Sequence, residues 1–201
     1  MKKALVITMI MLFAVSMFPF SLYSANPTPS FIVDFQLDRK AEIESMSSGE
    51  YFQCVAEYTN DDVKITASVD NANWFLGYYC DFNAEENNFI KLRVKNETLG
   101  DTFEVWASTS TSGNYPIRLD LWQCEPNSTQ YKEYIFDVSE NIGSGAWAGN
   151  IKRIRLDFIV GPNPQKDDVI YLDYFAVFKT KADAEAFSID AWESANPPGN
   201  I

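Results

Sequence analysis

Residues with the chemistry to bind a ligand recur at alternate positions along short segments of the chain. Segments 102–108 and 117–122 alternate apolar side chains with charged or aromatic ones, and segments 89–95 and 151–158 do the same. Because side chains two positions apart share one face of a β-strand, the polar and aromatic members of each segment point to one side. The pattern therefore predicts an outward face that carries Arg93, Glu104, Trp106, Arg118, Asp120, Trp122 and Arg155.

An outward face with two indole rings among guanidinium and carboxylate groups has the chemistry that a sugar needs. An indole covers the apolar C–H face of a pyranose, while charged planar groups hydrogen-bond its hydroxyls. Two alternatives stay open: the two Trp side chains lie in the core or under a loop, and the charges form solvated ion pairs. Trp147 precedes a strand and either lines the rim of a cleft or packs structurally, with packing favoured.

A catalytic carboxylate pair is a further hypothesis for the same face. Glu104 and Asp120 would face each other if their segments pair, as two carboxylates do in retaining glycosidases. The neighbouring arginines would keep both carboxylates ionised. The chain contains no histidine, which excludes Ser-His-Asp and Cys-His mechanisms and His-ligated metals. We therefore expect that the protein is not an enzyme. A small glycosidase or lyase that uses a carboxylate pair stays open as an alternative.

The elements that position these residues are short strands separated by turns. Alternating or apolar runs occur at 31–35, 51–58, 63–69, 74–80, 89–95, 102–108, 117–122, 131–138, 150–158 and 169–178. Short strands at regular spacing predict an all-β fold, here a jelly-roll β-sandwich of two antiparallel sheets. A short C-terminal helix at 180–187, with Thr180 as its N-cap, completes it.

The segments 150–158 and 169–178 are expected to be neighbours in one sheet. Ile154, Leu156 and Phe158 alternate with polar residues in the first segment. The second segment alternates in the same way, with Ile170, Leu172 and Tyr174 on one face. A Gly- and Pro-rich turn joins the two segments, so the pattern predicts the closing pair of an antiparallel sheet.

The ends of the chain give its domain organisation. A basic start and an apolar run predict a signal peptide at 1–25, with a membrane anchor as the alternative. Residues 26–30 are expected to be a linker, 31–190 the domain and 191–201 a disordered tail. The expected location is therefore secreted or extracellular, with no membrane contact after cleavage.

Charge and cysteine content restrict the partners. The chain has 16 basic and 28 acidic residues, a net charge of −12, so it repels nucleic acid and suits a neutral ligand or divalent cations. An exported protein could oxidise two of its three cysteines, Cys54, Cys80 and Cys124; three reduced thiols are the alternative. The spacing of the cysteines does not suit zinc.

One C-terminal stretch resembles a known family. Residues 147–157 read Trp-x-Gly-x-Ile-x-x-Ile-Arg-Leu-Asp, and residues 170–174 read Ile-x-Leu-Asp-Tyr. This resembles the end of carbohydrate-binding modules with the galactose-binding-like jelly roll, of the family 4, 9 and 22 types attached to bacterial glycoside hydrolases. Upstream, from about Phe31, the similarity is one of strand rhythm. The resemblance implies a secreted, non-catalytic β-sandwich that binds a polysaccharide or cell-surface glycan, alone or within cell-surface or glycoside hydrolase complexes.

The resemblance also implies a structural calcium ion. In many such modules an Asp that matches Asp173 helps to hold Ca²⁺ beside the N-terminal strand, and carboxylate and carbonyl oxygens suit that ion. Asp34 is the partner that the sequence favours, with Asp157 second and a plain salt bridge as the alternative. An extracellular structural or adhesion module that binds a protein partner is the second functional hypothesis.

Overall fold

The computed structural model of the protein describes residues 25–160 and 164–199. All but the last residue of the predicted signal peptide lie outside this range. The strands are β1 (Phe31–Asp34), β2 (Ser47–Phe52), β3 (Cys54–Tyr58), β4 (Val63–Ala67), β5 (Phe75–Asn83), β6 (Phe89–Asn96), β7 (Thr102–Ser108), β8 (Ile117–Leu121), β9 (Lys132–Asp137), β10 (Ile142–Ser144), β11 (Asn150–Val160) and β12 (Val169–Phe178). The helices are α1 (Lys40–Met46), α2 (Lys181–Ala186) and α3 (Ile189–Ala195), with 3-10 turns at Leu37–Arg39, Ala84–Glu86 and Val138–Glu140.

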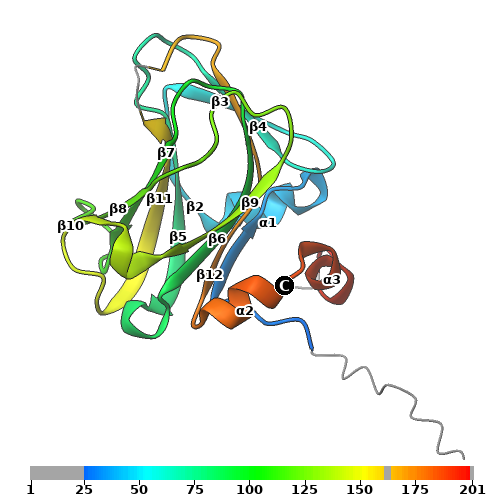
Figure 1. Cartoon of the computed structure of the whole chain (residues 1–201), viewed down its shortest axis with the longest axis vertical. Helices are drawn as coiled ribbons and strands as arrows, with labels where there is room; N and C mark the ends of the chain where they lie inside the picture. The colour runs from blue at the N-terminus through cyan, green and yellow to red at the C-terminus, as the bar shows by residue number, and fades with distance from the viewer. Residues whose placement is uncertain (1–24, 161–163, 200–201) are drawn as a thin grey trace, which may run out of the picture.

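Two six-stranded antiparallel sheets face each other, which confirms the predicted all-β sandwich (Figure 1). Sheet A has the order β3-β4-β12-β6-β9, with β1 also paired to β12. Sheet B has the order β10-β8-β7-β11-β5-β2. Within the described residues no helix is long and apolar enough to cross a membrane.

The prediction that 150–158 and 169–178 pair with each other is wrong. β11 lies in sheet B between β5 and β7, whereas β12 lies in sheet A between β4 and β6. The connection between them crosses from one sheet to the other. Alternation identifies which face of a strand is buried, but it is silent on the strand's partner, so a sheet-crossing connection looks like a hairpin in the sequence.

An irregularity in β12 inverts its alternation halfway along. The register with β6 shifts between Leu172 and Tyr174, and at this point the partner on the other side changes from β4 to β1. Leu172 belongs to the core between the sheets, but beyond the shift Phe175 does, and Tyr174 faces outward. The predicted grouping of Tyr174 with the inward residues is therefore corrected, because an extra residue in one strand reverses the face of all that follow.

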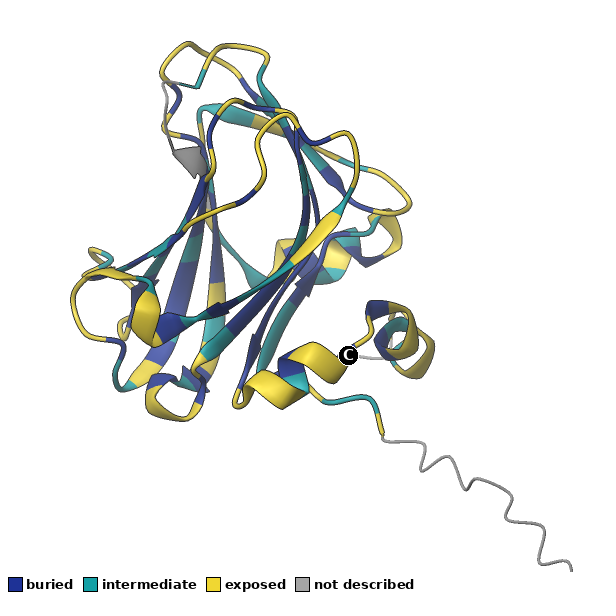
Figure 2. Cartoon of the chain, viewed as in Figure 1, coloured by how far each residue is buried: buried dark blue, intermediate teal, exposed yellow. Residues whose placement is uncertain are grey.

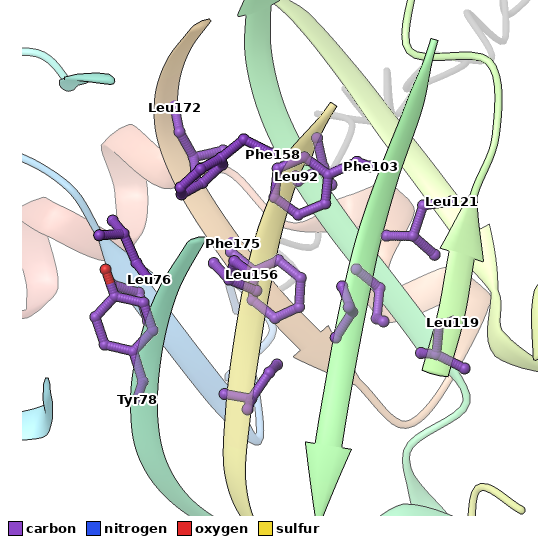
Figure 3. Packing of buried hydrophobic residues seen from close by; sticks show 14 of the residues in the cluster. Leu76, Tyr78, Leu92, Phe103, Leu119, Leu121, Leu156, Phe158, Leu172 and Phe175 are labelled. Atoms are coloured by element: carbon purple, nitrogen blue, oxygen red, sulfur yellow. The ribbon is translucent and has the colours of Figure 1, made fainter. Parts of the chain in front are cut away.

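The core lies between the sheets and follows the predicted alternation in the other central strands (Figure 2). Ile154, Leu156 and Phe158 of β11 are buried, and Leu92 of β6 packs with them. Figure 3 shows Leu156 and Phe175 meeting from opposite sheets, flanked by the rings of Phe103 and Phe158. Trp147 is also buried, and its ring nitrogen donates to the Asn87 carbonyl at 2.9 Å, which confirms the packing role over the cleft-rim alternative.

The predicted strand at 51–58 is two strands in different sheets. β2 pairs with β5 in sheet B, while β3 forms an antiparallel hairpin with β4 in sheet A. Gln53 lies between them with a φ of 49°, in the left-handed region. A non-glycine residue seldom adopts this backbone, and here it turns the chain from one sheet into the other.

The C-terminal segment is ordered further than predicted. Helix α2 has Thr180 as its N-cap, as expected, and a second helix, α3, follows over residues 189–195. Trp192 of α3 is buried, with the Arg39 guanidinium 4.6 Å above its ring. The prediction of a disordered tail from 191 is therefore wrong for residues 191–195, because Ile189 and Trp192 form a short apolar stripe.

The two C-terminal helices cover the outer face of sheet A. A second apolar cluster joins them to the outward side chains of β12, namely Tyr174, Ala176, Phe178, Ala184, Phe187, Ile189 and Trp192. Lys91 is buried beneath them, and its ammonium donates to the Phe187 carbonyl at 3.0 Å. The start of the predicted linker is also bound to this region, because the Asn26 side chain forms two hydrogen bonds with the Ser188 backbone. Among the residues that the structure describes, this second cluster contains no side chain from sheet B.

Candidate functional site

The outer face of sheet B arranges its side chains in two rows that run across the strands. In the first row Gly77, Arg155, Trp106 and Arg118 are successive cross-strand partners on β5, β11, β7 and β8. The second row lies two residues along the strands. Directly paired side chains in neighbouring strands are about 5 Å apart, so each row is a continuous surface. The second row consists of Phe52, Phe75, Asp157, Glu104 and Asp120.

Arg155 is the centre of this face. Its guanidinium lies 4.3 Å from the Phe75 ring centroid, 5.0 Å from that of Trp106 and 5.4 Å from that of Tyr115. A guanidinium at these distances is attracted by the negative faces of aromatic rings. Its Nε and one terminal nitrogen each donate to a carboxylate oxygen of Asp157 at 2.7 Å. One side chain therefore holds three rings and a buried carboxylate in fixed positions.

A shallow pocket of about 440 Å³ opens among these rings. Its walls are Phe75, Trp106, Tyr115 and Arg155, with Gly113 and Asn114 from the loop that follows β7. Phe52 extends the aromatic surface beyond the pocket, because its ring stacks on Phe75 with centroids 5.5 Å apart and 21° between planes. Phe52 is 46% exposed and the other three rings are half-buried. Flat rings edged by polar groups are the surface that a pyranose requires.

Three carboxylates lie in cross-strand register beside the rings. Asp157 on β11 is opposite Glu104 on β7, and Glu104 is opposite Asp120 on β8. Like charges placed directly opposite are destabilising, so each needs a donor. Asp157 accepts hydrogen bonds from the Arg155 guanidinium, and Glu104 accepts one from the Trp106 ring N–H at 2.9 Å. Burial raises the pKa of the Asp157 carboxyl to about 7, against the opposing effect of Arg155.

The third carboxylate is held in the same way and roofed by β10. A terminal nitrogen of Arg118 donates to one Asp120 oxygen at 3.2 Å, and the Arg118 Nε forms an ion pair with the other oxygen, 3.0 Å away. Gly143 of β10 lies directly over this pair, because a Cβ there would be 2.8 Å from the Arg118 Nε and would overlap the Asp120 carboxylate. A larger residue at position 143 would therefore displace the ion pair at this end of the face.

The structure brings five of the seven predicted binding residues together. Glu104, Trp106, Arg118, Asp120 and Arg155 share the outer face of sheet B, as the alternation predicted. Arg93 does not join them: it lies on β6 of sheet A, where it pairs with Asp173 and lies 4.8 Å from the Tyr131 ring. Trp122 follows the last residue of β8 and lies in a different pocket. Strand parity alone identifies an outward side chain without saying which sheet it faces away from.

Three further members of the face were not predicted from the sequence. Phe75 lies in a run that is apolar at both parities, which concealed its outward direction. Tyr115 ends a Ser- and Gly-rich loop and is brought over the strands by its loop, outside any strand period. Phe52 is positioned by the turn at Gln53. Asp157 lies two positions after Arg155 in the same strand, and this spacing is the sequence signal for the bidentate contact between them.

The arrangement around Asp34 and Asp173 does not fit a calcium site. The Asp34 carboxylate lies 2.5 Å from the Arg39 Nε, and Asp173 pairs with Arg93. The guanidinium beside each carboxylate supplies the positive charge that Ca²⁺ would bring. Across residues 25–160 and 164–199 no group of three or more acidic or sulfur ligands is arranged to hold a metal ion. The geometry thus favours the salt-bridge alternative for both residues.

Comparison with known proteins gives a likeness of fold. No protein-family model matches the chain, and no curated protein matches it. Among solved structures, a mutant of a carbohydrate binding module family 29 is similar, with a TM-score of 0.51 and 12% identity over 79% of this chain and 96% of that chain. A β-1,3-glucan binding CBM6 from Bacillus halodurans has a TM-score of 0.45 and 17% identity over 75% of this chain and 96% of that chain. The first likeness shows that this chain has the β-sandwich fold of a carbohydrate-binding module, without the specific resemblance to families 4, 9 and 22.

Proposed function

We propose that the protein is an exported, non-catalytic module that binds a neutral glycan on the outer face of sheet B. The observation that carries the proposal is the pocket of Phe75, Trp106 and Tyr115 around Arg155. Rings supply the apolar platforms, and Glu104 and Asp120 supply acceptors for hydroxyls at their edge. The fold shared with a carbohydrate-binding module supports the same reading. Export rests on the leader-like residues 1–25.

The charges on this face favour a neutral ligand over an acidic one. Arg155 and Arg118 are each already paired with a carboxylate, so neither is a free cation for a uronate or sulfate. The row of three carboxylates and the net charge of −12 would repel an anionic chain. We therefore expect neutral hexasaccharides to bind more tightly than acidic hexasaccharides.

The carboxylates on this face are suited to binding rather than to hydrolysis. Glu104 and Asp120 do lie opposite each other on β7 and β8, as the glycosidase hypothesis required. Each is engaged by its own donor, Trp106 and Arg118 respectively, and general acid catalysis needs one carboxyl that carries a proton. We expect no reducing sugar to be released from a bound polysaccharide, and release that is lost in Glu104→Ala would restore the enzymatic hypothesis.

Calorimetry with neutral hexasaccharides on wild type and Trp106→Ala tests the binding face. Sites of a few stacked rings bind with about 4–8 kcal/mol, which is millimolar to micromolar affinity. Loss of one stacked ring is expected to cost about 1–3 kcal/mol, by analogy with aromatic stacking on bases. Tyr171→Ala is the matched control, because Tyr171 is a half-buried ring on the outer side of sheet A, packed against Lys95. Equal affinity in wild type and Trp106→Ala, or no binding to any neutral glycan, would contradict the proposal.

A further inference from the structure

Trp122 lies outside the face of sheet B and belongs to a second pocket at the edge of the sandwich. β8 ends at Leu121, and Gln123 has a φ of 77° in the left-handed region. The chain then returns to the fold through the hydrogen bond from Cys124 N to the Asp101 carbonyl, at 2.8 Å. Trp122 lies between the end of β8 and this turn, and its ring is 53% exposed. A large exposed ring next to a residue in the strained left-handed region is a candidate for a binding role.

The pocket beside Trp122, which we call the edge pocket, has a volume of about 420 Å³. It spans the gap between the end of β8 in sheet B and β9, the last strand of sheet A. The residues that line it are Trp122, Gln123, Tyr134, Ile135, Phe136, Asp137, Glu140 and Asn141. It thus shares no lining residue with the pocket around Arg155.

The β9 side of the edge pocket is a fixed aromatic wall. The Tyr134 and Phe136 rings are nearly parallel, with 18° between planes and centroids 6.1 Å apart. The Tyr134 hydroxyl accepts the Glu125 N–H at 2.8 Å, which fixes the ring in place. Phe136 is buried and joins the core. The wall is therefore rigid before any ligand arrives, which limits the entropy cost of binding.

Polar groups surround the Trp122 ring. Asn141 donates from its side-chain nitrogen to the Asp137 carbonyl at 2.6 Å, and it brings an amide to the lining of the pocket. Asp137 accepts from the Ser139 backbone and hydroxyl through one carboxylate oxygen, so the other oxygen is available for a ligand. Gln123 and Glu140 are exposed at the rim. Acceptors and amide donors around an open ring are the chemistry that recognises sugar hydroxyls.

We propose that the edge pocket is a second carbohydrate site, which takes a neutral pyranose stacked on Trp122. The acidic pair Asp137 and Glu140 excludes an anionic sugar, and the lining contains no cation. A peptide added as a strand along β9 fits less well, because the pocket spans only residues 134–137 before the 3-10 turn Val138–Glu140 closes that end. The two sites together would make the module bivalent toward one polysaccharide. The choice of probe and the bivalency rest on the proposed function, whereas the edge pocket itself does not.

Indole NMR signals distinguish the two sites in one titration. The chain has five Trp residues, and Trp74, Trp147 and Trp192 are at most 8% exposed, so their three signals are internal controls. The signals of Trp106 and Trp122 are assigned from the Trp106→Ala and Trp122→Ala variants. Cellohexaose, mannohexaose and laminarihexaose are the probes. The expected result is that the Trp122 signal shifts with saturation, in wild type and in Trp106→Ala alike.

Each outcome decides between the sites. A Trp122 signal that stays fixed while Trp106 saturates overturns the second site and leaves the proposed function standing. A shift of Trp122 alone supports the edge pocket and removes the face of sheet B. No shift with any hexaose removes both. Retention on the insoluble form of the bound glycan gives a second readout: Trp122→Ala should reduce it at least tenfold if the sites act together, and equal retention would contradict bivalency.

Discussion

Replacement of Arg155 by Met should destabilise the protein in a way that depends on pH. The change removes both hydrogen bonds to Asp157 and the contacts with three rings. Asp157 is only 5% exposed, so in the variant its charged form has no partner in a buried position. Burial raises the folded-state pKa of Asp157 to about 7, and without Arg155, which lowers it, that pKa rises further.

The sign of the pH effect follows from this shift. At pH 5.5 Asp157 is mostly protonated in both proteins, so the substitution costs only packing and hydrogen bonds to an uncharged carboxyl group, about 1–2 kcal/mol. At pH 8.5 the wild-type protein has an ionised Asp157 paired with Arg155. In the variant, Asp157 must either be ionised and buried without a partner, or stay protonated at a pH where protons are scarce, and both states cost free energy. Breaking a buried pair costs about 3–5 kcal/mol. The loss of unfolding free energy should therefore be about 2 kcal/mol larger at pH 8.5.

Urea unfolding at both pH values on a double-mutant cycle measures this. Adding Asp157→Asn to Arg155→Met removes the unpaired charge, so the coupling energy should be about 2 kcal/mol at pH 8.5 and under about 1 kcal/mol at pH 5.5. Arg118→Met is the matched control, because Arg118 has a side chain 34% exposed and its loss should cost about 1 kcal/mol or less at either pH. A cost for Arg155→Met that is the same at both pH values, or a cycle that is additive, would refute the reasoning.

Four further outcomes are expected. The melting temperature should rise as pH falls from 8 towards 5.5. Burial raises the pKa of Asp34 and Asp157 to about 7, so the folded protein binds protons in this range, whereas the unfolded chain, with Asp pKa values near 3.9, does not. A melting temperature that falls over this range would contradict the prediction. Excess EDTA should leave the melting curve unchanged, and a lower melting temperature would restore the calcium hypothesis. Trp192→Ala should cost about 3–5 kcal/mol in chemical unfolding, because the ring is buried against Arg39; a cost under 1 kcal/mol would mean that α3 is not docked. Thiol titration of the denatured, unreduced protein should find three thiols per chain, since all three cysteines are free in the structure, and one thiol would indicate a disulfide.

Period-two alternation was sufficient to predict most of the strands and most of the side chains on the outer face of sheet B. It placed Glu104, Trp106, Arg118 and Arg155 outward because a pleated strand sends every second side chain to the same face. It failed where the backbone departs from the pleat. The shift at Leu172–Tyr174 reverses β12, and no residue type at that point marks it.

Contacts between residues far apart in the sequence were the second feature that the sequence patterns could not predict. Arg93 has the same outward parity as Arg118, yet the two strands lie in opposite sheets. The pocket needs Tyr115 from a loop and Phe75 from a strand 40 residues away, and local patterns carry no information on such meetings. Helix α3 left a weak local signal in Ser188, whose side chain caps the Ala191 N–H. Two turns are too short for periodicity to reveal a helix on its own.

The hydrogen bonds between Asn26 and Ser188 bring the two ends of the described chain together on the sheet A side (Figure 1). A surface or a second polypeptide attached at either end would therefore meet the covered back of the sandwich. The outer face of sheet B, with its aromatic rings, would then point away from the attachment and towards the solvent. Immobilisation through either terminus should consequently leave ligand capacity intact, whereas random coupling through lysines would orient a share of the molecules the other way.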